Sequence, residues 1–267
     1  FIKKKPSSNE IKKTKKWINN RLVNIKDEYV PWKNNTKFEE LNINNHKKKI
    51  GFFFSSEFEV FQAKEYRKKF LFKNQIHIVK ILLELLKDKK DFHLYLKLHP
   101  NQRFEKSNLI SKLNKLKKKH NFTLYSPNTN LNNFALLDKL DLVVTTASSI
   151  AAEASFRKKD VINIGPNLSN SFKTNKVIYK MSELRLAIIK FINEGRVNKN
   201  LNLNSLNSLK FFYSFRNFQT KSIYLKRFNY LIGYLERNKK KKYLIGSLYY
   251  FILYIFIRIF YKLRRLL

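Results

Sequence analysis

The chain has 267 residues, which is enough for one or two domains with a sizeable core. Its 56 lysine and arginine residues outnumber 19 aspartate and glutamate residues, and the net charge of +37 favours an anionic partner such as an acidic membrane surface, nucleic acid or a phosphorylated substrate. There is no cysteine, which excludes disulfides and thiolate metal sites. Because lysine is over-used along the whole chain and is not gathered in one motif, we do not expect nucleic acid to be the partner.

Residues 1–46 are polar, and we interpret them as an interdomain connection or the remnant of an N-terminal half. They contain a short helical pattern around Ile11–Val23, on one face of which Trp17 can pack. The apolar run Ile50–Phe54 then predicts a buried strand. The strand is followed by the polar residues Ser55, Ser56 and Glu57.

Residues 47–195 alternate between predicted strands and predicted helices. Apolar residues at helical spacing predict helices over residues 70–87, 107–119, 130–140 and 182–193. Short apolar runs predict strands over residues 50–54, 93–98, 122–125, 142–144 and 160–165, with a small edge strand over 177–179. This alternation, with short loops, predicts an α/β fold: a Rossmann-like, doubly wound parallel sheet with helices on both faces.

The stretch Asp141–Ser155 predicts a buried central strand, a turn rich in hydroxyl groups, and a helix. Ser148 or Ser149 suits the N-cap position, and Glu153 lies in the first turns, where a carboxylate suits the helix dipole. Free N–H groups at such a helix start can bind phosphate. The alternative is an ordinary serine-capped turn with no ligand.

Polar clusters follow several of the predicted strands, and ligands of doubly wound sheets bind at that edge. The clusters are Ser55–Glu57, His99–Asn101, Thr145–Ser149 and Gly165–Asn167. His99 can offer a hydrogen bond or a positive charge to a phosphate, and Pro100 stiffens its turn, although a turn histidine without a ligand is the alternative. Glu57 is a candidate acid or base. No spaced cluster of histidines and carboxylates predicts a metal site.

The C-terminal part divides into two segments. Residues 196–238 are rich in aromatic side chains and predict helices that fold back on a partner domain, and residues 239–267 predict a basic and apolar membrane-associating segment. The uncharged run Tyr243–Ile257 as a helix spans about 22 Å, less than the ~30 Å of a bilayer core. We therefore expect an anchor at an anionic membrane surface. A buried core helix is the alternative, and a full span requires flanking basic side chains to snorkel.

Several of these motifs together resemble the C-terminal, donor-binding half of GT-B glycosyltransferases of the bacterial capsule and surface-polysaccharide type. The resemblance covers about residues 47–195, and the segments that carry it are Lys48–Glu57, Gln75, Leu96–Asn101 and Leu137–Glu153. The His-Pro and Ser-Ser pairs are also similar to motifs of GT-B sialyltransferases, Kdo transferases and CDP-glycerol glycerophosphotransferases. There is no GxGxxG, P-loop or GxSxG motif, which argues against a dehydrogenase, a P-loop ATPase and an α/β-hydrolase.

The resemblance implies roles for particular residues. His99 would contact the donor phosphate or nucleotide, and Glu153 would bind the ribose hydroxyls. The full set of donor or phosphate contacts that we predict is Ser55, Ser56, His99, Pro100, Asn101, Ser148, Ser149 and Glu153, with His99 and Glu57 as catalytic candidates. The reaction would need no bound metal and no cofactor. The acceptor-binding half, and with it the usual catalytic base, is expected to lie outside this sequence.

We thus expect a metal-independent glycosyltransferase that moves a sugar from a CMP- or UDP-linked donor to a glycan or lipid-linked acceptor. It would work at the cytoplasmic face of the membrane, peripherally or through a C-terminal anchor. One alternative is glycerophosphate transfer from CDP-glycerol. Another is a basic module that binds a membrane or polyanion without turnover, for which Ser148→Ala and His99→Ala would have no effect. A nucleotide-sugar epimerase is less favoured, because it would not need a membrane tail.

Overall fold

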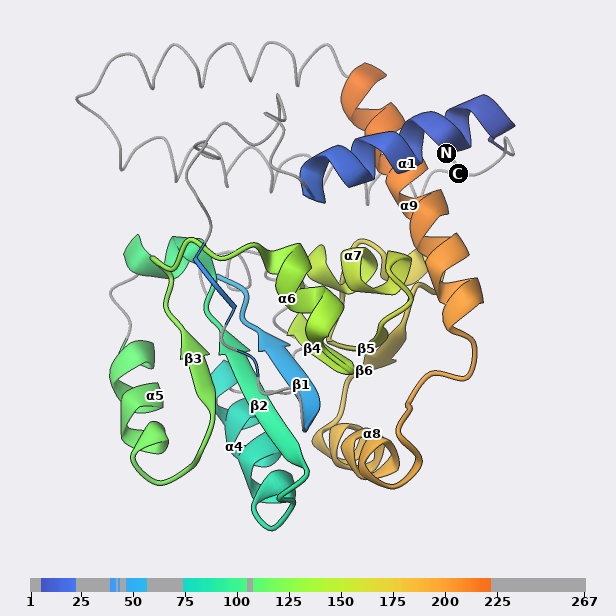
Figure 1. The fold of residues 1–267 in the computed structure, drawn as a ribbon. Helices are drawn as coiled ribbons and strands as arrows, with labels where there is room; N and C mark the ends of the chain where they lie inside the picture. The colour runs from blue at the N-terminus through green and yellow to red at the C-terminus, as the bar shows by residue number, and fades with distance from the viewer. Residues whose placement is uncertain are drawn as a thin grey trace, which may run out of the picture.

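The computed structural model describes residues 6–22, 39–41, 43, 47–56, 74–104 and 108–221. Its centre is a six-stranded sheet with the strand order β3-β2-β1-β4-β5-β6, in which every pairing is parallel (Figure 1). The strands are β1 (Lys48–Phe53), β2 (Phe92–Lys97), β3 (Thr123–Tyr125), β4 (Leu142–Thr146), β5 (Asp160–Ile164) and β6 (Lys176–Ile178). This order confirms the predicted Rossmann-like sheet. The strand order reverses between β1 and β4, because β2 and β3 are added on one side of β1 and β4, β5 and β6 on the other.

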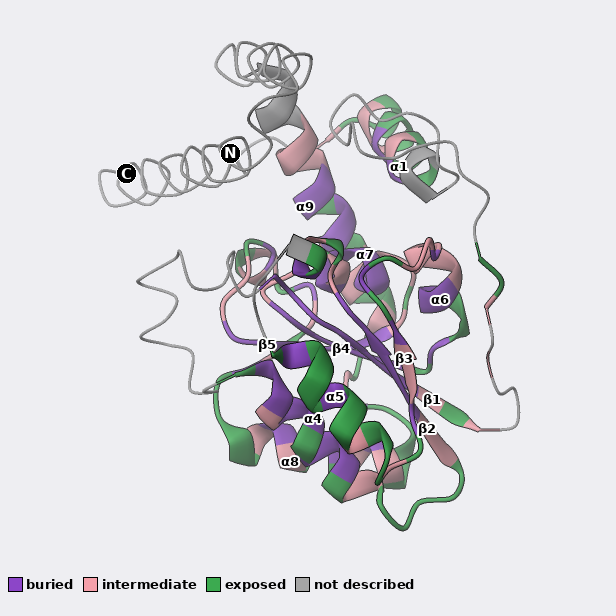
Figure 2. Ribbon diagram, turned by 90° about the vertical axis from the view of Figure 1, so that its left-hand side faces the viewer, coloured by how far each residue is buried: buried purple, intermediate pink, exposed green. Residues whose placement is uncertain are grey.

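Helices cover both faces of the sheet, as a doubly wound fold requires. One face carries α4 (Gln75–Leu86), α5 (Leu109–Lys117) and α8 (Met181–Glu194), and the other carries α6 (Asn133–Lys139) and α7 (Ile150–Phe156). Two short 3-10 helices, η1 (Pro100–Phe104) and η2 (Asn170–Phe172), follow β2 and β5. The strands β4 and β5 are buried throughout, the edge strands β3 and β6 are buried only in part, and many of the exposed residues lie on the outer sides of the helices (Figure 2).

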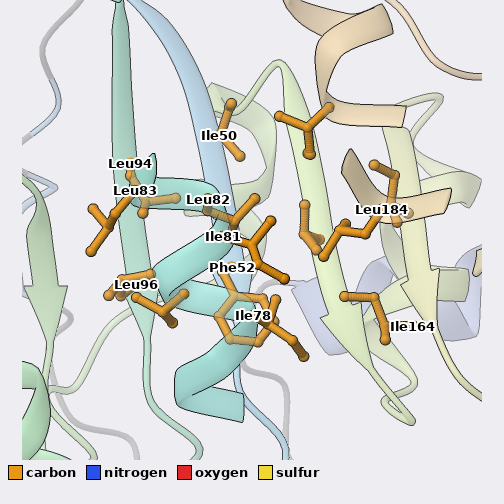
Figure 3. Packing of buried hydrophobic residues seen from close by; sticks show 14 of the residues in the cluster. Ile50, Phe52, Ile78, Ile81, Leu82, Leu83, Leu94, Leu96, Ile164 and Leu184 are labelled. Atoms are coloured by element: carbon orange, nitrogen blue, oxygen red, sulfur yellow. The ribbon is translucent and has the colours of Figure 1, made fainter. Parts of the chain in front are cut away.

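The side chains of each central strand alternate between the two layers of core. Ile50 and Phe52 of β1 point to the larger cluster, where Ile78 and Leu82 of α4 and Leu184 of α8 pack on the sheet (Figure 3). Because both faces of the sheet are covered, β1 and β4 are apolar almost throughout, and their runs are visible in the sequence.

The α6 layer packs so closely on β1 that only glycine fits at position 51. A Cβ atom at this position would clash with Cδ1 of Leu140, the residue that follows α6. The glycine therefore permits a close approach between the sheet and the α6 layer, in which Leu137 and Val143 also pack.

A third cluster of buried apolar residues joins α1 (Ser8–Leu22) and α9 (Leu201–Lys221), two helices that pack on other helices rather than on the sheet itself. The helix α9 packs on α7, and α1 packs on α9 through Ile18, Leu209 and Phe212. Both α1 and α9 lie on the side of the molecule where the strands end (Figure 1). Of the segment 196–238, residues Leu201–Lys221 form α9, and its folding back on a partner domain stays a prediction.

The structure differs from the expectations at a few positions. The helical pattern over residues 107–119 places Leu109, Ile110, Leu113 and Leu116 on one buried face, but Ile110 is 39 % exposed. The helix α8 begins at Met181, and the Glu183 carboxylate accepts hydrogen bonds from the amides of Tyr179 and Lys180. The predicted C-terminal apolar helix lies outside the described residues, and no helix within the described ranges is long and apolar enough to cross a membrane.

Candidate functional site

The predicted polar clusters come together at one edge of the sheet. They follow β2, β1, β4 and β5, which are consecutive neighbours in the strand order. All these strands are parallel, so their carboxyl ends open on the same side. Hydrogen bonds described below join each cluster to the next across that edge.

Gln75 joins the end of β1 to the end of β4. Its side-chain amide accepts a hydrogen bond from the Ser55 N–H and donates one to the Ser55 carbonyl, both at 2.9 Å. The same Oε1 accepts from Thr146 Oγ1 at 3.0 Å, and Ser55 Oγ donates to the Thr146 carbonyl. All three residues are buried, with 4 % exposure or less. The Ser55 hydroxyl therefore holds the two central strands together at the point where the strand order reverses.

Gln102 joins the histidine turn to the same place. Its Oε1 accepts from the His99 N–H at 2.9 Å, and its Nε2 donates to the Ser55 carbonyl at 3.3 Å. Gln102 is only 3 % exposed, so these bonds are shielded from water. The sequence-based reasoning missed this residue. The available signal was its position three residues after His99, from which a glutamine side chain can reach back to the histidine amide.

The orientation of the His99 ring is set by its own turn. The Asn101 N–H donates to His99 Nδ1 at 3.1 Å. Since Nδ1 is the acceptor, the neutral imidazole carries its proton on Nε2. Pro100 begins η1, where its missing N–H costs nothing and its fixed φ suits the turn. Half-buried His99 therefore presents Nε2–H as its hydrogen-bond donor.

The turn between β4 and α7 carries the two predicted serines. Ser149 is exposed and its Oγ donates to the Glu153 carboxylate at 3.2 Å, while Glu153 itself is 6 % exposed. Ser148 Oγ accepts from the Ile150 N–H at 3.3 Å. Ala147 precedes them with φ +45°, a strained left-handed conformation for a residue with a side chain. Such strain concentrates at functional sites.

The predicted phosphate cradle at the start of α7 is corrected in one respect. The amides of Ala151, Ala152 and Glu153 donate to the carbonyls of Ser148 and Ser149, so the helix-start N–H groups are not free. Ser149 occupies the N-cap position but makes no side-chain cap, and α7 has only 7 residues. The groups that this turn offers to a ligand are therefore mainly the serine hydroxyls.

The loop after β5 completes the edge. Gly165 ends the strand with φ +79°, and the Asn167 side chain donates to the Ser148 carbonyl at 2.6 Å. Asn163 Nδ2 donates to the Gly165 carbonyl at 2.8 Å. The serine turn is thus supported from the β5 side as well as from its own helix.

A buried lysine lies beside this edge and was not predicted. Lys97, the last residue of β2, is 4 % exposed, and its Nζ donates to the Ser126 carbonyl at 3.2 Å. Burial lowers the pKa of Lys97 to about 8, and the nearby Glu39 carboxylate acts in the opposite direction. Lys97 is the end of the strand that leads to His99.

Two predictions remain outside this geometry. Glu57, the candidate acid or base, lies outside the described residues, so its role stays a prediction. Ser56 is buried, with 1 % exposure. No group of three or more His, Cys, Asp or Glu side chains in the described part of the chain could hold a metal ion.

No family model matches the sequence, and no curated protein matches it. Among solved structures, the chain is similar to the β-Kdo 2,4-transferase KpsC of Thermosulfurimonas dismutans, with 13 % identity and a TM-score of 0.46, over 77 % of this chain and 56 % of that one. It is similar to MnaA of S. aureus bound to UDP, with 17 % identity and a TM-score of 0.46, over 68 % of this chain and 46 % of that one.

A third similar structure is sucrose-phosphate synthase of Thermosynechococcus elongatus, with 12 % identity and a TM-score of 0.47, over 70 % of this chain and 47 % of that one. The chain thus spans about half the length of these three proteins. Similarity at this level does not extend to activity, so the function is argued from the site and its sequence motifs.

Proposed function

We propose that this chain contains the donor-binding half of a GT-B glycosyltransferase that builds a surface polysaccharide. The sugar would leave a CMP- or UDP-linked donor and pass to a glycan or lipid-linked acceptor. One observation carries the proposal: the histidine turn is hydrogen-bonded to Ser55 at the end of β1, and Ser55 is hydrogen-bonded to the end of β4, from which the serine turn continues, at the place where the strand order reverses. Doubly wound sheets bind nucleotides in the crevice at this point.

The residues on this edge suit a nucleotide leaving group. In sugar transfer the bond from the anomeric carbon to the donor phosphate oxygen breaks, and a bond to the acceptor oxygen forms. The nucleotide leaves with added negative charge on its phosphate. In the proposal, His99 Nε2–H and the Ser148 hydroxyl donate hydrogen bonds to those oxygens, and the Ser149 hydroxyl joins them by turning from the Glu153 carboxylate to the phosphate, which lowers the barrier.

Glu153 would bind the ribose. One of its oxygens already accepts from Ser149, and a carboxylate has further lone pairs for the ribose hydroxyls. The acceptor hydroxyl must lose a proton, and the candidate for this task in the sequence is Glu57. We place the transfer at the cytoplasmic face of the membrane, because the uncharged run Tyr243–Ile257 follows the basic residues Lys239–Lys242.

The test is nucleotide binding by the full chain, measured as a thermal shift with CMP, CDP, UDP, UMP, GDP and ADP. A ligand at ~100 times its Kd adds about 2.7 kcal/mol of stability, or about 5–10 °C for a domain of this size. His99→Ala and Ser148→Ala should remove the shift without lowering the melting temperature of the free protein by more than a few degrees. His120→Ala and the exposed Ser111→Ala are matched controls that should keep it.

The outcomes separate the candidate functions. A selective shift with CMP or UDP supports the corresponding nucleotide-sugar donor, and EDTA should leave that shift unchanged. A selective shift with CDP favours glycerophosphate transfer from CDP-glycerol. If His99→Ala and Ser148→Ala bind nucleotide as the parent does, the site assignment is wrong. If no nucleotide binds and only polyanions do, the non-enzymatic module replaces the transferase.

A further inference from the structure

The helix α1 presents a strip of lysines to the solvent. Lys12, Lys13, Lys15 and Lys16 are all exposed, and we call them the α1 lysine face. Because an α-helix has 3.6 residues per turn, Lys12 and Lys16 lie one above the other. The buried residues Thr14 and Ile18 lie on the opposite side.

The opposite side of α1 is fixed to the protein. Ile18 is buried in the cluster with α9, and the Trp17 ring lies 6.2 Å from that of Phe212. The Tyr213 hydroxyl donates to Glu10 Oε1 at 2.9 Å. The apolar side of the helix is thus already covered, so the helix is a rigid base from which the lysines project.

These lysines have no acidic partner in the described part of the chain. Glu10 is the one acidic residue of α1, and it is engaged at the helix start by the Ser7 amide, the Ser7 hydroxyl and Tyr213. No ion pair involves the α1 lysine face among the described residues. Four positive charges therefore lie within about 6 Å of helix length, with no acidic partner among the residues that the structure describes.

The place of α1 favours a membrane over other polyanions. It packs on α9, and the sequence that continues from α9 holds the basic run Lys239–Lys242 and the uncharged run Tyr243–Ile257. The exposed face offers no arginine fork for bidentate phosphate contacts. It also offers no free aromatic ring on which a base could stack, since Trp17 packs against Phe212.

We propose that the α1 lysine face docks on the surface of an anionic phospholipid bilayer. The negative potential of such a surface attracts each nearby lysine enough to raise partitioning about fivefold, within a screening length of about 8 Å at physiological salt. Since α1 lies on the side where the strands end (Figure 1), docking would hold the site edge on the membrane side of the molecule. This surface is separate from the nucleotide site and does not depend on the proposed transfer reaction.

The test is sedimentation of the full chain with vesicles of phosphatidylcholine containing about a third phosphatidylserine, and with pure phosphatidylcholine vesicles. Replacing Lys12, Lys13 and Lys16 together by glutamine should lower partitioning onto the anionic vesicles about 100-fold, with neutral vesicles unaffected. The matched control replaces the exposed Lys112 and Lys115 of α5 and Lys118, which directly follows α5, by glutamine; this removes the same charge from another face and should change partitioning little.

Two results would overturn the proposal. Equal losses in the two triple variants would show that only net charge matters, and full binding by the α1 variant would show that another segment carries the membrane contact. A single-stranded oligonucleotide serves as the competing partner: if the α1 variant loses oligonucleotide binding but keeps vesicle binding, the face is a nucleic-acid surface instead. The thermal shift with nucleotides should be unchanged in both variants, which keeps this test independent of the donor site.

Discussion

Replacing Lys97 by methionine is expected to stabilise the fold at neutral pH. Lys97 is 4 % exposed, and its pKa is lowered to about 8 by burial. The unfolded value is about 10.4, and a difference of this size corresponds to about 3 kcal/mol spent on keeping the buried ammonium charged at neutral pH. Methionine fills a similar volume without the charge. It removes one of the two donors to the Ser126 carbonyl, which keeps the Thr129 N–H. This costs about 1 kcal/mol, so the net gain is about 2 kcal/mol.

The pH dependence gives the sign of the effect. Below about pH 8, Lys97 is protonated in both the folded and the unfolded chain, so the cost of the buried charge is fully present. Between there and about pH 10.4, the unfolded chain binds more protons than the folded chain, so the parent gains stability as pH rises. The variant lacks this gain. Its advantage of about 2 kcal/mol at pH 7 should therefore vanish as the pH rises, and by about pH 10.5 the variant should be about 1 kcal/mol less stable than the parent.

Urea unfolding followed by tryptophan fluorescence, repeated from pH 6.5 to 10.5, measures this difference directly. Other groups that titrate in this range, including Lys159, whose pKa burial also lowers, are common to both proteins and cancel. The exposed Lys112→Met is the control and should show no such trend. A Lys97→Met variant that is less stable than the parent at pH 7, or a difference that stays flat with pH, would refute the reasoning.

Two further predictions about stability concern β1 and the residues directly after it. Gly51→Ala should destabilise the fold by about 1–3 kcal/mol because its Cβ meets Leu140; a urea midpoint equal to that of the parent would contradict the close packing. Gln75→Leu should cost about 2–5 kcal/mol, since the buried N–H and carbonyl of Ser55 each lose a partner. Calorimetry tests this cost, and a loss below about 1 kcal/mol would mean that water replaces the amide.

The elements that could be predicted from the sequence are those whose signal is local. The central strands β1 and β4 are apolar runs because both faces are covered, and α4 and α6 carry one apolar stripe each. Ile110 was misplaced because Leu109 and Leu113 already define the buried stripe of α5, and the next residue turns away from it. The apolar pattern at the start of α9 is weak, because Leu203 and Leu206 are about half exposed, at 49 % and 48 %. The helices on which α9 packs, α1 and α7, are also distant in sequence.

The positions of the site residues were predictable, but their tasks were not. A polar residue directly after a predicted strand can be placed at the carboxyl edge of the sheet from the sequence. Its hydrogen-bond partner cannot, because the partner can be far away in sequence: Ser55 and Thr146 are 91 residues apart. That contact turns the Ser55 hydroxyl inward. The exposed Ser149 lies on the turn beyond its strand, where a ligand can reach it.

Replacing Ser55 and Ser149 by alanine should therefore have opposite effects on stability and on nucleotide affinity. Ser55→Ala removes a buried hydrogen bond and should lower the free energy of unfolding by about 1–3 kcal/mol, with nucleotide affinity changed less than threefold once the folded fraction is taken into account. Ser149→Ala should leave stability within about 0.5 kcal/mol, as for most exposed sites, and weaken nucleotide binding about tenfold, the loss of one hydrogen bond to a charged phosphate. Urea unfolding and nucleotide titration on the same preparations measure both quantities. If Ser55→Ala loses affinity but not stability, the hydroxyl faces the ligand and the buried network is not what holds the two strand ends together.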